Sequence, residues 1–175
     1  MNDFLFTIAD KLIKNHSLTI DEYEQLISGY FKGLAEYLRA NAVKVRKDVY
    51  GNQVFVRGLI EISNICKNNC LYCGIRSGNF YCQRYRLTPK EIMQCCVEGY
   101  ELGFRTFVLQ GGEDGFYNDD ILCHLISNIK KVFPDCAVTL SLGERSRESY
   151  QKLFNAGADR YLLRHEAADK ELYGK

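Results

Sequence analysis

The alternation of two kinds of segment after residue 50 constrains the fold of this 175-residue chain more than any other feature. Apolar segments of strand-like composition alternate with segments in which apolar residues recur at helical spacing. The predicted strands cover residues 54–62, 106–110, 137–142 and 160–164, and the predicted helices between them cover residues 89–102, 119–133 and 146–155. Because strands joined by crossover helices pair in parallel, this order predicts an α/β fold with a parallel sheet.

The first 50 residues have a different pattern. Thr19 is followed three residues later by Glu22, which is the spacing of a capping box, and apolar residues then recur at helical spacing as far as Leu38. Gly51 and Asn52 form a turn signal. We therefore expect a helical extension over residues 1–50 and an α/β part over residues 51–175.

Each predicted strand is followed by a polar motif. Residues 66–73 follow the first strand, and residues 110–114, with the sequence Gln-Gly-Gly-Glu-Asp, follow the second. Residues 141–144 close the third strand, and residues 164–166 close the fourth. In a parallel barrel of the TIM type all four motifs lie at the C-terminal face, where such enzymes build their active sites.

The number of strands is too small for a closed barrel. A complete (β/α)8 barrel has eight strands and about 250 residues, whereas this sequence contains about four βα units. A weak internal repeat, between residues 103–110 and 157–164, supports stacked units of this kind. We interpret residues 51–175 as the N-terminal half of a TIM-type barrel, truncated from a longer enzyme. The alternative is a half-barrel that dimerises or needs a partner chain.

Three cysteines in the first loop define the chemistry. Cys66, Cys70 and Cys73 have C-x3-C-x2-C spacing and supply three thiolates to one site. A [4Fe–4S] cluster normally takes four cysteines, so a cluster held by three leaves one iron open to a non-protein ligand. Two other interpretations remain open. Cys82 can complete a structural zinc site, because thiolates also suit zinc, and a disulfide with a spare thiol is a third arrangement.

Composition restricts the partners and the compartment. The 23 basic and 22 acidic side chains nearly cancel, so charge gives no argument for binding nucleic acid or an anionic membrane. We find neither a signal peptide nor a membrane-spanning stretch and expect a cytoplasmic protein. Thiols stay reduced in that compartment, so eight cysteines favour cluster or metal chemistry. Most of the remaining five lie in apolar helix or strand patterns and are expected to be buried without a chemical role; the five are Cys82, Cys95, Cys96, Cys123 and Cys136.

About two-thirds of the chain, from residue 54 onward, resembles the HydE family of [FeFe]-hydrogenase maturases in the radical S-adenosylmethionine (SAM) superfamily. Biotin synthase and methylornithine synthase share the cysteine motif but are less similar over residues 139–144 and 158–166. The segments that carry the resemblance are residues 60–64, 70–74, 84–89, 108–114, 139–144 and 158–166.

The resemblance implies a [4Fe–4S] cluster and SAM as cofactors, and the cleavage of SAM to a 5′-deoxyadenosyl radical. The cluster ligands implied are Cys66, Cys70 and Cys73. The residues implied or expected to contact SAM are Tyr72, Gln110, Gly111, Gly112, Glu113, Ser141, Glu144 and Glu166. Those implied to line the substrate cavity are Thr139, Ser141, Arg160 and Arg164.

The same resemblance implies a role in maturation of the hydrogenase H-cluster. The expected partners are a one-electron donor of the ferredoxin or flavodoxin type and other hydrogenase maturation proteins, with no nucleic acid and no membrane. Two competing hypotheses remain: another radical SAM enzyme of the biotin synthase or methylornithine synthase type, and a non-catalytic zinc-binding fragment. Arg84 and Arg86 are interpreted as surface or ion-paired residues.

Overall fold

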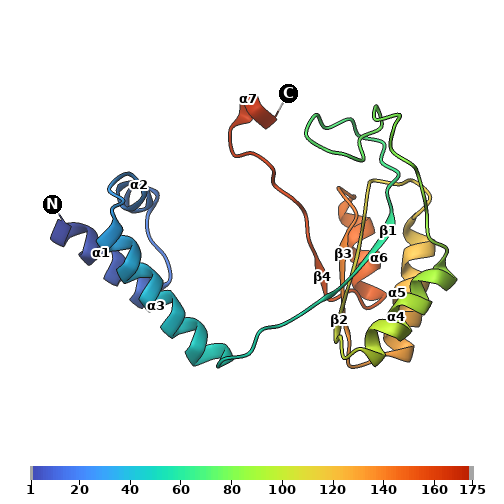
Figure 1. Ribbon diagram of the computed structural model, residues 1–175, viewed down its shortest axis with the longest axis horizontal. Coiled ribbons are helices and arrows are strands. Elements are labelled where there is room, and N and C mark those ends of the chain that lie inside the picture. The colour runs from blue at the N-terminus through green and yellow to red at the C-terminus, as the bar shows by residue number, and fades with distance from the viewer. Residues whose placement is uncertain (1, 174–175) are drawn as a thin grey trace. The chain divides into compact units, whose positions relative to one another are not determined.

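A computed structural model describes residues 2–173 of the chain. The contacts between residues divide it into two compact units, Met1–Phe55 and Val56–Lys175. Figure 1 labels the helices and strands of both. Each unit has its own hydrophobic core, and the two are described separately.

The first unit consists of three helices. They are α1 (Asn2–Asn15), α2 (Ile20–Ser28) and α3 (Lys32–Tyr50). Thr19 accepts a hydrogen bond from the backbone N–H of Glu22, and the Glu22 carboxylate accepts one from the backbone N–H of Thr19, so the predicted capping box is present. The buried core of this unit comprises Leu5, Ile8, Ala9, Leu26 and Leu34.

The second unit is a four-stranded parallel sheet with the strand order β1-β2-β3-β4. Helices connect successive strands, as the sequence predicted. The elements are β1 (Gly58–Ser63), α4 (Pro89–Glu101), β2 (Thr106–Gly111), α5 (Asp119–Val132), β3 (Ala137–Ser141), α6 (Arg147–Asn155), β4 (Arg160–Tyr161) and α7 (Lys170–Tyr173).

One face of this sheet is covered by helices. Thr88, Asn118 and Ser146 cap the N-termini of α4, α5 and α6 with their side-chain oxygens. Figure 1 shows these three helices on the same side of the sheet. The strands contribute every second residue to the core between the two layers, because successive side chains point to opposite faces. These strand residues are Ile60, Ile62, Phe107, Leu109, Val138 and Leu140.

The opposite face of the sheet carries polar side chains toward the C-terminal ends of the strands. Glu61 is aligned with Gln110, which is aligned with Ser141. Two residues earlier along the strands, Val108 is aligned with Thr139, which is aligned with Arg160. In a closed barrel this face is the interior. The sheet therefore presents a row of polar groups where a barrel enzyme has its active site.

Two predicted strands are longer than those observed by more than one residue. The first was predicted over residues 54–62, but β1 begins at Gly58, where its pairing with Phe107 begins. Residues 54–56 are exposed despite their apolar side chains. The fourth was predicted over residues 160–164, but β4 contains only two residues, because its pairing with β3 ends near Leu140. Apolar composition marked both strands, and the extent of the pairing with the neighbouring strand sets their limits.

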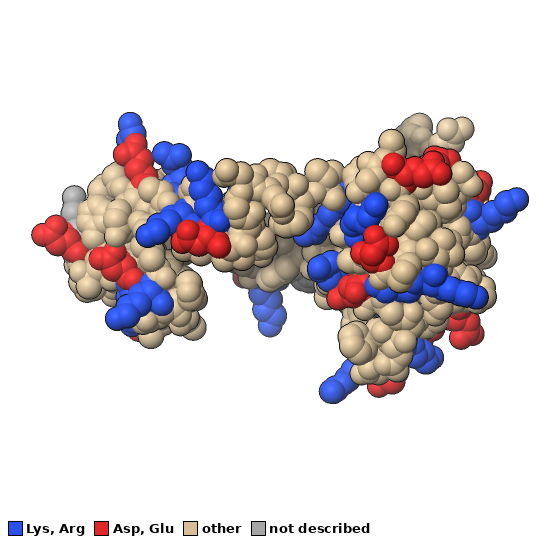
Figure 2. Space-filling model, turned by 90° about the horizontal axis from the view of Figure 1, so that it is seen from below, with Lys and Arg blue, Asp and Glu red and all other residues tan. Residues whose placement is uncertain are grey.

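The surface carries both signs of charge. Figure 2 shows basic and acidic side chains interspersed on the face that it draws. This distribution agrees with the formal net charge of +1. Within residues 2–173, none of the helices combines the length and the hydropathy that are needed to cross a membrane.

Candidate active site

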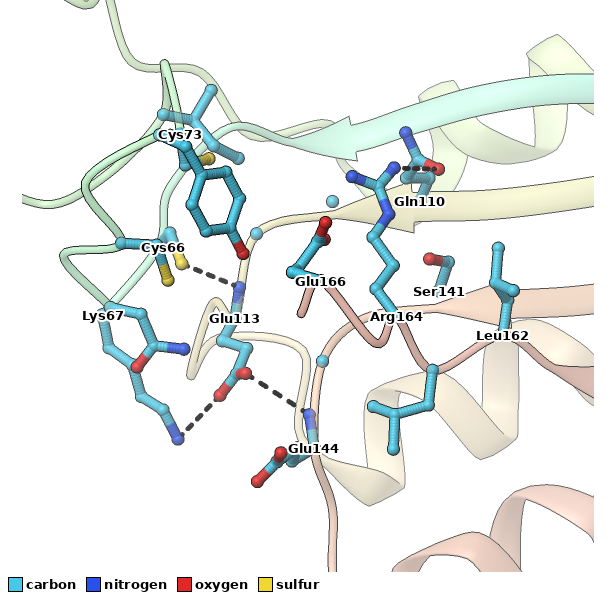
Figure 3. Close-up of a pocket in the computed structure, with 18 of the residues that line it drawn as sticks. Cys66, Lys67, Cys73, Gln110, Glu113, Ser141, Glu144, Leu162, Arg164 and Glu166 are labelled. Carbon is cyan, nitrogen blue, oxygen red and sulfur yellow. Dashed lines mark hydrogen bonds and ion pairs between the residues drawn. The ribbon is translucent and has the colours of Figure 1, made fainter. Parts of the chain in front are cut away.

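A cavity of about 410 Å³ lies at the C-terminal ends of the strands (Figure 3). Every one of the four predicted strand-end motifs contributes to it, as the rule for parallel barrels requires. Its size is within the range of small-molecule sites in proteins. The lining residues are Glu61, Cys66, Lys67, Asn68, Cys70, Tyr72, Cys73, Ile75, Gln110, Gly111, Gly112, Glu113, Ser141, Gly143, Glu144, Leu162, Leu163, Arg164 and Glu166.

The three cysteines of the spaced motif all line this cavity. Cys70 is exposed, and Cys66 and Cys73 are partly buried. The backbone N–H of Glu113 donates a hydrogen bond to the Sγ atom of Cys66 at 3.4 Å (Figure 3). Thiolates are the ligands that iron–sulfur clusters take, and three of them at one cavity suit a cluster with one iron left open. These residues fit such a group.

Cys82 does not join them. Its Sγ atom accepts from the side-chain amide of Asn64 at 3.7 Å, and it lies outside the cavity lining. Within residues 2–173, no group of three or more His, Cys, Asp or Glu side chains is arranged to hold a single metal ion. A structural zinc site gathers four ligands around one point, and Cys82 lies apart from the three cysteines that line the cavity.

Gly112 brings the second loop against the cysteine loop. A Cβ atom at this position would lie 2.3 Å from the carbonyl oxygen of Ile65 and 2.7 Å from the Cβ atom of Cys66. Only glycine allows this approach. The approach also places the Glu113 N–H against the sulfur, and the backbone N–H of Lys67 donates to the Glu113 carbonyl at 3.2 Å.

We expect Gly112→Ala to destabilise the second unit by about 2 kcal/mol, because the added methyl group overpacks against backbone atoms. Gly115→Ala is the matched control, since a Cβ atom there has no neighbour within 4 Å and the backbone needs no positive φ. Urea denaturation followed by circular dichroism measures both. Equal stabilities of the two variants would contradict the prediction.

Glu113 is the most connected carboxylate of the cavity. Its Oε2 atom pairs with Lys67 Nζ at 2.9 Å, and its Oε1 atom accepts from the backbone N–H of Glu144 at 3.3 Å (Figure 3). The hydrogen bond to Glu113 raises the pKa of Lys67 above its ordinary value. Gly143 has a φ of +79°, and a Cβ atom there would overlap the Glu113 side chain. The second and third strand-end loops are therefore joined through one side chain.

A second chain of contacts runs across the sheet. Gln110 donates from Nε2 to Glu61 Oε1 at 2.8 Å and accepts at Oε1 from the Arg164 guanidinium at 3.3 Å. Figure 3 shows Arg164 directed at Gln110, with Glu166 and Ser141 nearby. The two residues at matching positions of the weak sequence repeat, Gln110 and Arg164, are thus in direct contact.

Tyr72 and Glu166 lie at the mouth of the cavity. The Tyr72 side chain is 69% exposed, and its pKa is raised by partial loss of hydration and then by the negative charge of Glu166. The aromatic residue before the third cysteine therefore lies near the carboxylate of the fourth strand-end motif.

All the residues expected to contact the cluster or SAM line the cavity, but two expected substrate residues do not. Thr139 is buried two residues before Ser141 on the same face of β3, and Arg160 is aligned with it on β4. Both therefore lie one layer below the rim. The Thr139 hydroxyl is buried without a hydrogen-bond partner among the described residues.

Glu61 and Lys67 also line the cavity, although no motif in the sequence indicated them. Glu61 had a usable signal, since it is the only charged residue between Leu59 and Ile62 in an apolar strand. Lys67 had no such signal, because a lysine between two cysteines is also expected in a loop that is simply exposed to solvent.

Asp114, which directly follows Glu113, is held by an ion pair with Arg86. The Arg86 guanidinium donates from Nε and Nη2 to the two carboxylate oxygens of Asp114, each at 2.7 Å. Ser63 donates to the same carboxylate at 2.7 Å, and only 3% of the Asp114 side chain is exposed. Burial raises the pKa of Asp114, but the hydrogen bonds from Arg86 and Ser63 outweigh it and the pKa is lowered. Arg86 is ion-paired, as expected.

The sequence of residues 60–175 matches the model of the family described as the radical SAM superfamily. The chain belongs to this superfamily of enzymes. Within it, the chain is 43% identical to the [FeFe] hydrogenase maturase subunit HydE of Thermotoga maritima over 168 residues, which are 96% of this chain and 47% of that protein. This identity confirms the resemblance to HydE.

Other relatives have different names. The 3-methylornithine synthase of Methanosarcina barkeri is 33% identical over 97% of this chain and 48% of its own length. The crystal structure of methylornithine synthase (PylB) has a TM-score of 0.79 and 32% identity, covering 95% of this chain and 49% of that one. The crystal structure of HydG, a maturase of the [FeFe]-hydrogenase, has a TM-score of 0.82 at 26% identity, covering 93% and 37%.

These comparisons also confirm the fold class. The second unit is a TIM-type radical SAM domain with about four βα units. The chain spans about half the length of the curated relatives that it matches.

Proposed function

We propose that the protein holds a [4Fe–4S] cluster on Cys66, Cys70 and Cys73 and binds SAM in the adjoining cavity. The observation that carries the proposal is that three thiols and the polar ends of four parallel strands line one cavity. When bound and reduced by an external one-electron donor, the cluster supplies the electron that cleaves SAM to methionine and a 5′-deoxyadenosyl radical.

The chain's own residues have separate tasks in this proposal. Glu113 and Glu166 offer carboxylates to the amino group of SAM, and Ser141 and Gln110 offer hydrogen bonds deeper in the cavity. Glu144 and Tyr72 border the opening. Gly111 and Gly112 allow the second loop to pack against Ser63, Ile65 and Cys66, at the start of the cysteine loop.

We propose that the substrate binds at the polar face of the sheet, below the strand ends that line the cavity. Arg164 is held by Gln110, and Arg160 and Thr139 lie one layer deeper. Cationic and hydroxyl groups in a barrel interior need anionic or polar partners, because their burial alone costs free energy. A small anionic substrate fulfils this requirement.

We further propose that the protein acts in maturation of the [FeFe]-hydrogenase H-cluster. The 43% identity to a protein named as a HydE maturase supports this assignment. The partners are then an electron donor of the ferredoxin or flavodoxin type and other maturation proteins. In the same proposal, residues 1–50 form a helical extension and residues 51–175 the first half of the barrel.

The second candidate is a radical SAM enzyme that acts on a small organic substrate. The 33% identity to a 3-methylornithine synthase and the TM-score of 0.79 to a methylornithine synthase favour it. Conversion of an amino acid substrate by the reconstituted protein, without any requirement for hydrogenase partners, would select this candidate over the first.

The experiment that tests the cofactor proposal uses the 175-residue chain reconstituted with iron and sulfide under anaerobic conditions. We expect a broad absorption near ~400 nm and, after reduction with dithionite, an EPR signal that SAM alters, because one iron is open to it. A colourless chain that retains zinc would refute the cluster. An EPR signal unchanged by SAM would refute the proposal that this chain binds SAM beside the cluster.

A further inference from the structure

The cysteine loop is long and lacks regular structure. Residues 64–88 separate β1 from α4, and only an isolated bridge between Ser63 and Arg86 interrupts the turns and bends. Loops longer than about 15 residues are uncommon in compact domains unless they serve a function. Their backbone carbonyls also need partners that a sheet or helix would otherwise supply.

Arg84 donates hydrogen bonds to four of the backbone carbonyl groups in and next to this loop. Its Nη1 atom donates to the carbonyl oxygens of Asn64 at 2.6 Å and Ile75 at 2.7 Å. Its Nη2 atom donates to the carbonyl oxygens of Arg76 at 2.6 Å and Asn79 at 3.2 Å. Both terminal nitrogens are therefore used on backbone acceptors rather than on a carboxylate.

The carbonyl groups that accept from Arg84 lie on both sides of the three-cysteine segment. Asn64 lies two residues before the first cysteine of the motif, and Ile75 and Arg76 lie just after the third. One guanidinium group thus ties together the two ends of the segment that carries all three cysteines. A planar group with donors fixed in a fork suits this task, and a lysine ammonium, which is a single point charge, does not.

We infer that Arg84 is the positioning residue of the cysteine loop. Its guanidinium group holds the loop folded against the cavity in the metal-free chain, so that the three thiols are arranged before any group binds. Arg84 lies outside the cavity lining and acts only through the loop. The consequence for cluster uptake rests on the proposed function, whereas the consequence for the loop does not.

Amide hydrogen exchange of the metal-free 175-residue chain, read by NMR, tests the inference. The reporters are backbone amides hydrogen-bonded within the loop, those of Cys73, Arg76, Ser77 and Asn79. In Arg84→Gln we expect their exchange to accelerate by about tenfold or more, while amides of β2 and β3 keep their rates, because a local opening leaves the rest of the fold closed. Arg84→Lys should accelerate the same amides by a smaller factor.

Arg105→Gln is the matched control. Arg105 also donates to two backbone carbonyls, those of Tyr100 and Phe104, but it lies between α4 and β2. We expect this variant to leave the loop amides unchanged. Loop rates in Arg84→Gln within twofold of the parent chain would overturn the inference, and so would equal acceleration of the β2 and β3 amides, which indicates a general loss of stability.

Iron uptake gives a second, separable result. After anaerobic reconstitution we expect Arg84→Gln to bind at least threefold less iron per chain than the parent, with Arg105→Gln unchanged. If the parent itself takes up no cluster, the proposed function fails, and the exchange rates still decide the role of Arg84. If Arg84→Gln has a loosened loop but normal iron uptake, arrangement of the thiols by Arg84 is refuted.

Discussion

Cys70→Ser is expected to abolish iron uptake, whereas Cys82→Ser is expected to leave it unchanged. A cluster held by three thiolates cannot lose one of them without losing its anchorage. Cys70 lines the cavity, and Cys82 does not. Iron and acid-labile sulfide per chain after anaerobic reconstitution measure both variants, and we expect a fall of at least about tenfold in the first.

A further control separates this effect from general loss of thiols. Cys95→Ser removes a partly buried thiol of α4 that packs against the core of the second unit and belongs to no loop of the site. Its iron content should equal that of the parent chain. The opposite pattern, with metal lost in Cys82→Ser and kept in Cys70→Ser, would replace the cluster by a zinc site.

Asp114→Asn is expected to destabilise the second unit by about 2 kcal/mol at neutral pH. The substitution removes the negative charge that faces the Arg86 guanidinium and leaves one acceptor oxygen where the carboxylate offered two. Breaking a buried pair from one side costs about 3–5 kcal/mol, and the partial exposure of Arg86 reduces this figure. Exchange of the slowest β2 and β3 amides measures the change, because those amides open only when the unit unfolds.

Asp135→Asn provides the matched control. Asp135 pairs with Arg105 at 3.0 Å, a distance similar to that of the buried pair, but about half of each side chain is exposed. An exposed pair contributes about 0.2–1 kcal/mol. A loss in Asp135→Asn as large as that in Asp114→Asn would contradict the role given to burial.

The contribution of Asp114 to the stability of the second unit should fall at acid pH. Its pKa is lowered in the folded chain by Arg86 and Ser63, which outweigh burial. The carboxylate therefore contributes its full stability above its unfolded pKa of about 3.9, and the contribution is lost as the pH falls through the folded pKa. The stability difference between the parent chain and Asp114→Asn should be constant near neutral pH and shrink below about pH 4.

Much of the second unit followed from local sequence signals. The apolar periodicity placed the helices within one or two residues of their observed ends, and Thr88 and Ser146 cap two of them in the structure. Such signals act over a single helical turn, so they are readable without knowledge of the fold. The limits of β1 and β4 were not readable, because they depend on where the pairing with a neighbouring strand begins and ends.

The candidate site also has a part that the sequence predicted and a part that it did not. The spacing of the cysteines and the rule that parallel strands end at one face were sufficient to bring Cys66, Gln110, Ser141 and Glu166 to one cavity. No rule of that kind indicated the partner of Glu113. Its pairing with Lys67 depends on the close approach of two loops, which Gly112 and Gly143 permit.

The sequence alone determined the order of strands and helices, the end of the sheet that carries the chemistry and the three thiols that define it. These properties follow from periodicity, capping and spacing within short segments of chain. Only the tertiary structure decided that Thr139 and Arg160 lie below the rim, that Asp114 is buried against Arg86, and that Arg84 ties the cysteine loop. Each of these involves contacts whose geometry is fixed only when distant segments pack together.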